Sequence, residues 1–289
     1  PGYGSVGRIC AKGEAVTDFR VGDRVFYAGK HASVQRFRHG EDHQWNYLFP
    51  VPDGLDPVDA TVGCMAQIAL TAPNITPLRL GDTVAVFGLG MVGNLAAQIY
   101  AMRGARVVGV DPEPARCETA RRTGIGETLD VAPDEQVQAV LDLTGGKGAD
   151  VTVDAAGHAA VVATCVQATA LFGQILLLGS PRAACSRNLT ELLSDIHVNG
   201  KVMRGAHMWH FPVRQGRETS LSVEWNFATV FGLIQTGKLK VRELISHVIA
   251  PADAAEAYDG LQNHRDRYTG VVIRWASRLG DGPNPTSHP

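Results

Sequence analysis

An alternation of apolar runs and helical stretches over residues 83–205 constrains the fold more than any other feature of the 289-residue chain. The run Thr83–Phe87 is apolar along nearly its whole length, which is typical of a strand covered on both faces. Further strands are expected at 106–110, 150–154, 174–178 and 201–205, with helices at 92–102, 113–123 and 158–171, and a strand edge and helix within 131–143. This alternation predicts right-handed crossovers and a doubly wound parallel sheet over about 75–207.

The chain on either side of this region has a different pattern. Residues 1–70 show short strands and turns, with strands at Val6–Cys10 and Arg24–Tyr27, and helical spacing begins near Ala60. After the sheet, a helix is expected over 224–236, a strand over 245–249, a helix over 251–261 and a strand over 270–275. The Gly- and Pro-rich tail, residues 277–289, predicts disorder.

A glycine motif lies where the first strand of the predicted sheet meets its first helix. Its G-x-G-x-x-G pattern consists of Gly88, Leu89, Gly90, Met91, Val92 and Gly93. In such a turn the first glycine permits a tight bend, the second lets a pyrophosphate approach the backbone, and the third lets helix and strand pack closely. The helix N-terminus would face the phosphates with its free N–H groups. The six residues are therefore candidate contacts of a dinucleotide cofactor.

Asp111 ends the second strand and follows Gly88 by 23 residues, close to the spacing of a ribose-binding acid. A carboxylate there accepts hydrogen bonds from a ribose diol and repels a 2′-phosphate, so NAD is expected rather than NADP. Arg116, five residues further on, is a cofactor-site candidate that would soften this preference. Two other interpretations stay open: a glycine-rich turn without a ligand, and the looser glycine motif of a methyltransferase.

The composition excludes several classes of partner. Lys and Arg number 27 and Asp and Glu number 29, so a net charge of −2 gives no basic field for nucleic acid or an acidic membrane surface. No apolar run is long enough to span a bilayer. The five cysteines are far apart and form no C-x-x-C pair, which favours reduced thiols in a cytoplasmic protein. A small-molecule substrate is the remaining expectation.

With the glycine motif flanked by these segments, the sequence resembles the medium-chain dehydrogenase/reductase superfamily. The segments that carry the resemblance extend over nearly the whole chain: PGYGSVGRI (1–9), VTDFRVGDRV (16–25), VPDGLDPVDA (51–60), LGDTVAVFGLGMVG (80–93), VVGVDPEPAR (107–116), GADVTVDAAG (148–157) and ISHVIAPADAAEAYDGL (245–261). Together, their order and spacing are quite specific. The opening PGYGSVGR and the stretch 31–33 resemble the branch around the bacteriochlorophyllide dehydrogenases.

The resemblance implies an α/β protein in which a Rossmann domain is inserted into a GroES-like β-barrel catalytic domain. Residues 1–72 and 208–276 would form the catalytic domain and residues 73–207 the Rossmann domain, with the cofactor in the cleft between them. Superfamily members carry a further segment before the motif that starts at Pro1. The chain is therefore expected to be truncated at its N-terminus, with an incomplete barrel.

Zinc-dependent members bind the metal through the histidine of a G-H-E motif, and this chain has Gly2, Tyr3 and Gly4 at the matching positions. Tyrosine is a poor zinc ligand and glycine cannot be one. Cys64 stands near the place of a further family ligand, but one thiolate does not make a three-ligand site. No zinc is expected, and Cys64 is interpreted as a small buried side chain. Tyr3 and Cys64 nevertheless stay candidate catalytic residues, with the Tyr3 phenol able to polarise a substrate oxygen.

Two histidines, His197 and His207, flank the last strand of the predicted sheet. His207 follows the strand end, where ligands gather in open α/β sheets, and is the third catalytic candidate. Matching to the superfamily adds cofactor contacts after two other strands, namely Ala155, Ala156, Gly179 and Ser180.

These features predict a zinc-independent, NAD-linked oxidoreductase that transfers a hydride between nicotinamide and an alcohol/carbonyl substrate. One alternative is NAD(P)H-dependent reduction of an activated C=C bond, as in quinone reductase-like relatives. Another is a catalytically inactive dinucleotide-binding module. The resemblance also implies a homodimer through the last strand of the Rossmann sheet.

Overall fold

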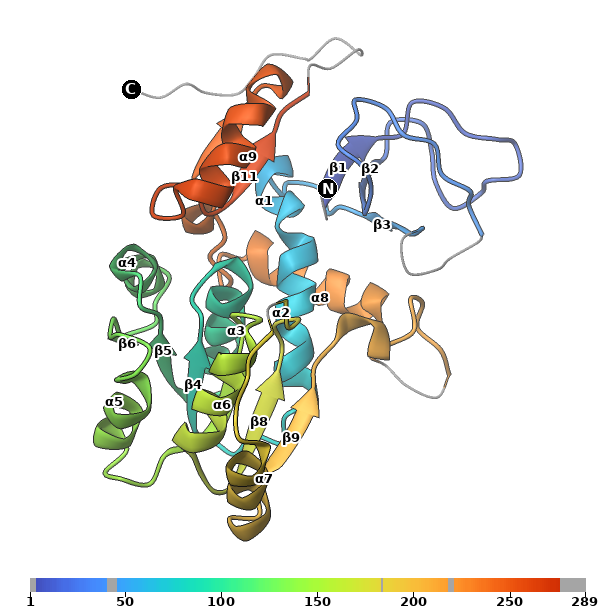
Figure 1. Cartoon of the computed structure of the whole chain (residues 1–289). Helices are drawn as coiled ribbons and strands as arrows, with labels where there is room; N and C mark the ends of the chain where they lie inside the picture. The colour runs from blue at the N-terminus through green and yellow to red at the C-terminus, as the bar shows by residue number, and fades with distance from the viewer. Residues whose placement is uncertain (1–3, 41–45, 183, 218–220, 276–289) are drawn as a thin grey trace.

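The computed structural model describes residues 4–40, 46–182, 184–217 and 221–275 (Figure 1). A six-stranded sheet forms one end of the molecule, and a three-stranded and a two-stranded sheet lie toward the other end. Helix α2 (Gly63–Ile75) runs between them. None of the helices in these residues has the length and apolar character needed to cross a membrane.

The six-stranded sheet has the order β6-β5-β4-β7-β8-β9, and every neighbouring pair is parallel. The chain adds β5 and β6 on one side of β4, and then adds β7, β8 and β9 on the other side. The carboxyl ends of β4 and β7 are therefore the point at which ligands bind in open α/β sheets. The doubly wound parallel sheet expected from the sequence is confirmed. Its strands are β4 (Thr83–Phe87), β5 (Arg106–Val110), β6 (Glu127–Leu129), β7 (Ala149–Asp154), β8 (Thr169–Leu177) and β9 (Val202–Gly205).

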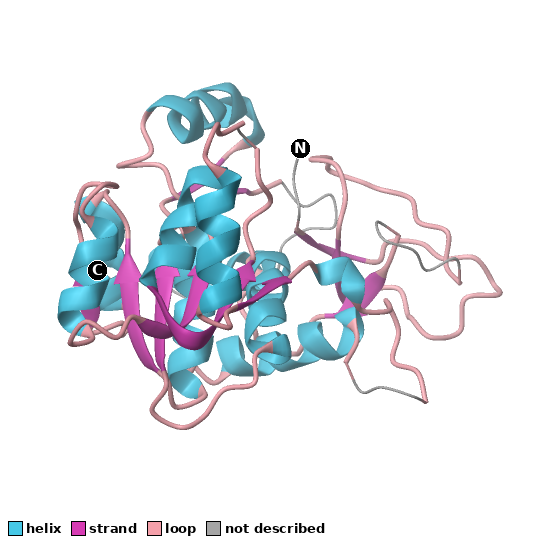
Figure 2. Cartoon of the chain, turned by 60° about the horizontal axis from the view of Figure 1, so that its bottom comes forward, coloured by secondary structure: helices cyan, strands magenta, loops and turns pink. Residues whose placement is uncertain are grey.

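Helices cover both faces of this sheet, as Figure 2 shows. Val84 and Val86 of β4 belong to the larger apolar core, whereas Ala85 and Phe87 belong to a second core on the opposite face. This two-sided burial explains why β4 is apolar along nearly its whole length. The connecting helices are α3 (Met91–Met102), α4 (Pro114–Arg122), α5 (Gln136–Leu143), α6 (Ala159–Ala168) and α7 (Leu189–Val198).

The remaining elements come from both ends of the chain. The antiparallel sheet contains β1 (Ser5–Arg8), β2 (Arg24–Tyr27) and β3 (Leu48–Pro50), and the small parallel sheet contains β10 (His247–Ile249) and β11 (Val271–Ile273). The accompanying helices are α1 (Pro57–Thr61), α8 (Val223–Gln235) and α9 (Ala254–Asn263). Short 3-10 helices lie at η1 (Met208–His210), η2 (Arg242–Leu244) and η3 (Pro251–Asp253).

An aromatic cluster joins the N-terminal strands to helix α8. The ring centroid of Phe227 lies 4.6 Å from that of Phe26, 5.0 Å from that of Phe49 and 5.6 Å from that of Phe231. Helix α8 contacts α2, and α2 in turn contacts α3. The larger apolar core is therefore continuous from the N-terminal strands to the parallel sheet.

Two polar connections fix the C-terminal segment to helices from distant parts of the sequence. The side-chain amide of Gln98 on α3 donates to the carbonyl of Lys240 at 2.9 Å and accepts from the N–H of Lys240 at 2.8 Å. Arg242 forms ion pairs at α1 with Asp56 at 3.1 Å and with Asp59 at 2.8 Å. The segment that enters η2 is thus held by both α3 and α1.

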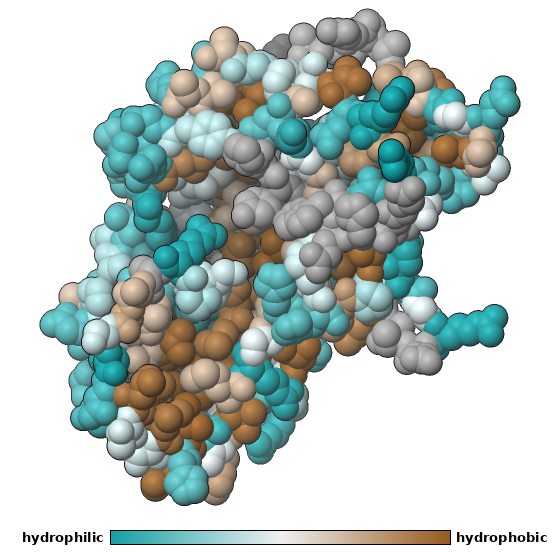
Figure 3. Space-filling view, turned by 45° about the vertical axis from the view of Figure 1, so that its right-hand side comes forward, coloured by the Kyte–Doolittle hydropathy of each residue, from teal (hydrophilic) through white to brown (hydrophobic). Residues whose placement is uncertain are grey.

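Apolar side chains remain exposed around the last strand of the parallel sheet. Strand β9 is an edge of that sheet. Figure 3 shows apolar side chains gathered on the lower half of this face, where β8, β9 and α7 lie. Contiguous exposed apolar side chains of this kind are typical of interaction surfaces. Its residues, here called the β9 patch, are Leu171, Phe172, Leu189, Leu193, Val198 and Val202, with exposed fractions of 44% to 74%.

The sequence prediction places two element boundaries wrongly. The helix expected to reach Leu171 ends at Ala168. The hydroxyl of Thr169 bonds to the carbonyl of Cys165 at 2.6 Å and pairs with the hydroxyl of Thr152 on β7 at 2.7 Å, so the chain joins the sheet there. The strand edge expected after residue 131 lies earlier, at β6, because residues 127–129 are the ones that pair with β5.

Helix α7 is absent from the predicted elements. Its apolar residues point both inward and outward: Leu192 and Ile196 pack on the second core, whereas Leu189 and Leu193 are exposed. A helix with apolar residues on opposite faces gives a weak periodic signal. The domain boundaries at residues 72 and 208 stay a prediction, and the tail, residues 277–289, lies outside the described residues.

We expect Phe227→Ala to lower the free energy of unfolding by about 3–5 kcal/mol, because it leaves a cavity inside a packed aromatic cluster. Phe227 is only 1% exposed. Urea denaturation followed by circular dichroism measures the change. Leu80→Ala, at a side chain that is 89% exposed, is the control and should change the free energy by less than about 0.5 kcal/mol. Equal losses in the two variants would contradict the packing described above.

Candidate functional site

The turn between β4 and α3 needs glycine at its first position. Gly88 has a φ of +93°, a left-handed conformation that side chains disfavour. Its N–H donates to the carbonyl of Val110 on β5 at 2.8 Å. On the other side, a Cβ at Gly88 would lie 2.9 Å from the backbone nitrogen of Ala156. The turn is therefore held between the ends of β5 and β7.

The second and third glycines have opposite surroundings. A Cβ at Gly90 would meet no atom within 4 Å, so the backbone there is open. Gly90 is also the N-cap of α3 and supplies no side-chain cap, which leaves the first N–H groups of the helix available. A Cβ at Gly93 would collide with the carbonyl oxygen of Gly88 and would lie 3.0 Å from the Cβ of Ala155. This geometry matches the pattern expected of a phosphate-binding turn, while ligand binding itself stays a prediction.

The side chains between these glycines face the protein. Leu89 is 2% exposed, and a Cβ at Gly109 would lie 2.9 Å from its side chain, so that side chain is not available to a ligand. Met91 and Val92 are partly buried against the larger core. The methyl group of Met91 also lies close to Gly270, just before β11. The C-terminal segment thus reaches the glycine turn.

Asp111 lies beside the glycine turn, and each oxygen of its carboxylate accepts a backbone N–H. One oxygen, Oδ2, accepts the N–H of Leu89 at 2.7 Å, and the other accepts the N–H of Glu113 at 2.9 Å. The guanidinium of Arg116 approaches Oδ2 at 3.4 Å. Asp111 is 1% exposed, so these three donors fix its orientation at the end of β5. The structure therefore brings Asp111, Arg116 and the glycine turn together.

The turns after β7 and β8 lie at the same edge of the sheet. The N–H of Ala155 donates to the carbonyl of Phe87 at the end of β4, 2.9 Å away. Gly179 packs so closely on Gly157 that a Cβ at Gly179 would collide with the nitrogen of Gly157. The predicted cofactor residues of these turns, Ala155, Ala156, Gly179 and Ser180, are therefore adjacent to the glycine motif.

Asp154 is a site residue that the sequence analysis missed. It ends β7 and is fully buried, and its Oδ1 accepts the N–H groups of Ala156 at 3.0 Å and Gly157 at 3.1 Å. Burial raises the pKa of the Asp154 carboxyl above its ordinary value, against the lowering effect of these two N–H donors. The sequence signal that could have found it is an acid directly before a small-residue turn at a strand end.

Cys64 lies at the start of α2 and is 1% exposed. Burial raises the pKa of its thiol to about 12, so the thiol is neutral near pH 7. The phenol of Tyr47, itself 1% exposed, lies beside it, and burial also raises the pKa of Tyr47. Among the described residues no group of three His, Cys, Asp or Glu side chains could hold a metal ion. Tyr3 lies outside the described residues.

The two candidate histidines lie at opposite ends of β9. His207 follows the carboxyl end of the strand, on the cofactor side, and is exposed. Its Nδ1 accepts the N–H of Trp209 at 3.4 Å, which leaves Nε2–H as a donor. His197 lies in the last turn of α7, before β9 begins, and is separated from the site by the length of the strand.

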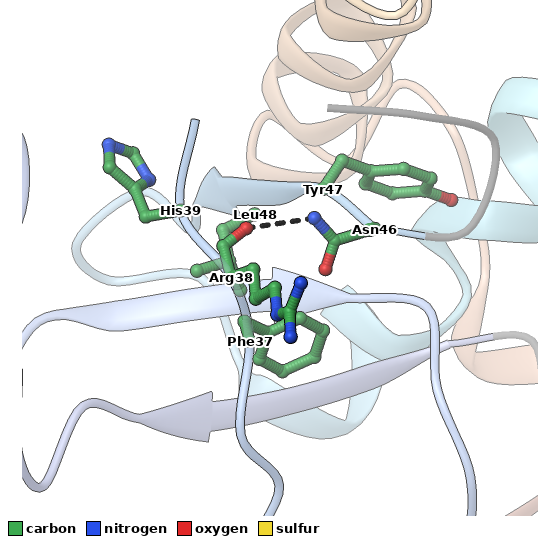
Figure 4. Close-up of a pocket in the computed structure, with 6 residues that line it drawn as sticks. All are labelled: Phe37, Arg38, His39, Asn46, Tyr47 and Leu48. Carbon is green, nitrogen blue, oxygen red and sulfur yellow. Dashed lines mark hydrogen bonds between the residues drawn. The ribbon is translucent and has the colours of Figure 1, made fainter. Parts of the chain in front are cut away.

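A small pocket in the N-terminal part of the chain contains none of the predicted site residues (Figure 4). The side-chain amide of Asn46 donates to the carbonyl of Arg38 at 2.8 Å, and the ring of Tyr47 points away from both. The lining residues are Phe37, Arg38, His39, Asn46, Tyr47 and Leu48. The pocket therefore adds nothing to the site at the sheet edge.

The chain is similar to several known dehydrogenases and reductases. The family model described as "Zinc-binding dehydrogenase" matches residues 91–215. D-guloside 3-dehydrogenase of Escherichia coli (strain K12) is 28% identical over 258 residues, 88% of this chain and 71% of that protein. A quinone oxidoreductase of Pseudomonas aeruginosa is 27% identical over 282 residues, 94% of this chain and 82% of that protein.

A solved structure shows the same fold. The apo form of zinc dependent alcohol dehydrogenase 2 from Streptococcus pneumonia superposes with a TM-score of 0.76 at 19% identity. The match covers 98% of this chain and 84% of that chain. At this level of identity the likeness concerns the fold alone.

We expect two of the five cysteines to react rapidly with Ellman's reagent at pH 8, because only Cys10 and Cys185 are exposed. Cys64, Cys117 and Cys165 are buried and should react only after unfolding in guanidinium chloride. The variant Cys64→Ala is the control and should keep two fast thiols. Rapid labelling of Cys64, identified by peptide mass spectrometry, would show that its thiol is accessible and would contradict this description.

Proposed function

We propose that the chain is a medium-chain dehydrogenase/reductase, and specifically an NAD-linked oxidoreductase that interconverts an alcohol and a carbonyl without catalytic zinc. The observation that carries the proposal is the open backbone at Gly90, at the uncapped N-terminus of α3 and beside the carboxylate of Asp111. These groups fit the phosphates and a ribose of a dinucleotide. A cytoplasmic location and a small-molecule substrate are part of the proposal.

Asp111 supports NAD over NADP. Its carboxylate is buried at the rim of the glycine turn, where a 2′-phosphate would add negative charge beside it. Arg116 neutralises part of this charge, because its guanidinium lies 3.4 Å from Oδ2. We therefore expect a preference for NAD that is moderate rather than absolute.

The chain's own residues would position the reactants. When bound, the nicotinamide cofactor supplies the hydride chemistry. The α3 N-terminus would hold the phosphates, Asp111 would orient the adenosine ribose, and the turns at 155–157 and 179–180 would line the remainder. A donor must also meet the charge that develops on the substrate oxygen. The candidates for this donor are the Tyr3 phenol and the Nε2–H of His207.

The residues that match zinc ligands of the superfamily do not fit a catalytic zinc. Cys64 has a buried, neutral thiol beside Tyr47, and Gly4 has no side chain to coordinate a metal. Zinc independence is proposed on this chemistry. The E. coli relative named D-guloside 3-dehydrogenase favours an alcohol as the substrate group.

A second candidate function is reduction of an activated C=C bond. The quinone oxidoreductase of P. aeruginosa covers 94% of this chain, which favours it. Asp111 argues for NADH rather than NADPH as the donor in that case as well. An inactive dinucleotide-binding module is the third possibility, and it would bind cofactor without turnover.

We expect the protein to bind NADH at micromolar Kd and NADPH about tenfold more weakly, equivalent to ~1.4 kcal/mol. Asp111→Asn keeps an acceptor for the Leu89 N–H and removes the negative charge. It should therefore reduce the difference between the Kd values for NADH and NADPH. Titration followed by nicotinamide fluorescence measures both. The control Glu118→Gln removes an exposed charge from helix α4, which follows Asp111, and should change neither Kd. Failure to bind either cofactor would contradict the proposed function.

The β9 patch supports a homodimer. Among the described residues, β8 is the one strand that pairs with β9, so the other edge of β9 is open. An open strand edge with flanking apolar side chains is prone to pair with another strand. We propose that a second copy of the chain covers the patch around a two-fold axis, with the two β9 edges side by side. Burial of the six exposed side chains would supply the apolar contact.

We expect a dimer in size-exclusion chromatography with light scattering at micromolar protein concentration. Leu193→Asp places a charge inside the β9 patch and should convert the dimer to a monomer that keeps its circular dichroism spectrum. Val21→Asp, at a side chain that is also 58% exposed but outside the patch, should stay dimeric. A monomeric wild-type protein would contradict this assembly.

A further inference from the structure

The turn at 155–157 lies at the centre of the candidate cofactor site. On one side it packs against the glycine motif, since a Cβ at Gly88 would lie 2.9 Å from the Ala156 nitrogen and a Cβ at Gly93 would lie 3.0 Å from the Ala155 Cβ. On the other side, a Cβ at Gly157 would lie 2.6 Å from the carbonyl oxygen of Ser180. The three turns therefore cannot shift independently of one another.

Asp154 makes hydrogen bonds to two of these turns and pairs with the strand that leads into the third. Its carboxylate Oδ1 accepts the N–H groups of Ala156 and Gly157, and its backbone carbonyl accepts those of Leu178 at 3.0 Å and Gly179 at 2.7 Å. In the sheet it is paired with Phe87, the residue directly before Gly88. Asp154 is therefore connected to all three turns and fixes their positions relative to one another.

The turn uses only one oxygen of the Asp154 carboxylate, Oδ1. Its second oxygen, Oδ2, is buried and has no hydrogen-bond partner among the described residues. The ionisable groups that act on Asp154 are His158, just after the turn, and the buried thiol of Cys165 on α6, and neither is a fixed positive charge. A buried acid without a cationic partner is costly, and such groups mark places where function constrains the chain.

We propose that Asp154 is a positioning residue for the cofactor, whose carboxylate holds the turn at 155–157 so that the glycine motif and the turn at 179–180 form one binding surface. This inference rests on the proposed dinucleotide site. It assigns to Asp154 no contact with the substrate. Loss of the carboxylate frees the N–H groups of Ala156 and Gly157, and the affinity for the cofactor falls while the sheet stays folded.

The experiment compares NADH binding by full-length wild type, Asp154→Ala and Asp154→Asn, with thermal unfolding of each. Asp154→Ala removes the oxygen that accepts both N–H groups, and the Kd for NADH should rise at least tenfold. Asp154→Asn keeps a carbonyl acceptor at the same place, and its Kd should return to within about threefold of wild type. Backbone amide exchange of Ala156 and Gly157, measured without cofactor, should be faster in Asp154→Ala and near normal in Asp154→Asn.

The matched control is Asp150→Ala on the same strand. Asp150 is exposed at the amino end of β7, and its carboxylate accepts the N–H of Thr83 at 2.8 Å. Its loss should lower the unfolding temperature and leave NADH affinity unchanged. If Asp154→Ala does not fold, Asp154→Leu, which keeps a branched side chain of similar shape and has no acceptor atom, gives the same comparison.

Three outcomes would overturn the proposal, and they are distinguishable. If the wild type binds NADH and Asp154→Ala or Asp154→Leu binds it equally well, the positioning role fails and the dinucleotide site stands. If the wild type binds neither NADH nor NADPH, the proposed function fails and the role of Asp154 fails with it. A loss of affinity in Asp154→Asn as large as in Asp154→Ala would also contradict the role, because the acceptor is retained there.

Discussion

Close backbone contact between three turns at the carboxyl edge of the sheet is the constraint on which the rest of the structure depends. Gly88, Gly157 and Gly179 approach neighbouring backbone more closely than any Cβ permits. Such contact requires β4, β7 and β8 to be adjacent and in register, which in turn requires helices on both faces to cover them. The site and the layered architecture are therefore consequences of one packing arrangement.

Sequence-based prediction is most accurate where a local steric requirement determines the residue type at a position. The bounds of β4 and β5 agree with prediction because both strands are buried on two faces and end at a glycine or an acid. The surroundings of Gly88, Gly90 and Gly93 follow from spacing alone, because a bend, an open backbone and a close contact each exclude a side chain. Neither prediction needs knowledge of distant residues.

The features that escaped prediction depend on contacts between distant residues. Asp154 gains its importance from turns that meet only after β4, β7 and β8 have assembled. The neutrality of Cys64 reflects burial beside Tyr47, 17 residues earlier in the chain. Helix α7 was not predicted because three of its five apolar residues face outward, in the β9 patch. In each case the local sequence carries no distinctive signal, and tertiary contacts determine the environment of the residues.

The connection between Gln98 and Lys240 has a consequence for how such a chain can diverge. Gln98 bonds to the main-chain N–H and carbonyl of residue 240, which every amino acid except proline provides. Position 240 is thus nearly free to mutate, while position 98 must keep a side-chain amide to preserve both bonds. Among homologues, residue 240 should therefore vary, while residue 98 should keep a side-chain amide. A contact between two side chains would restrict both positions.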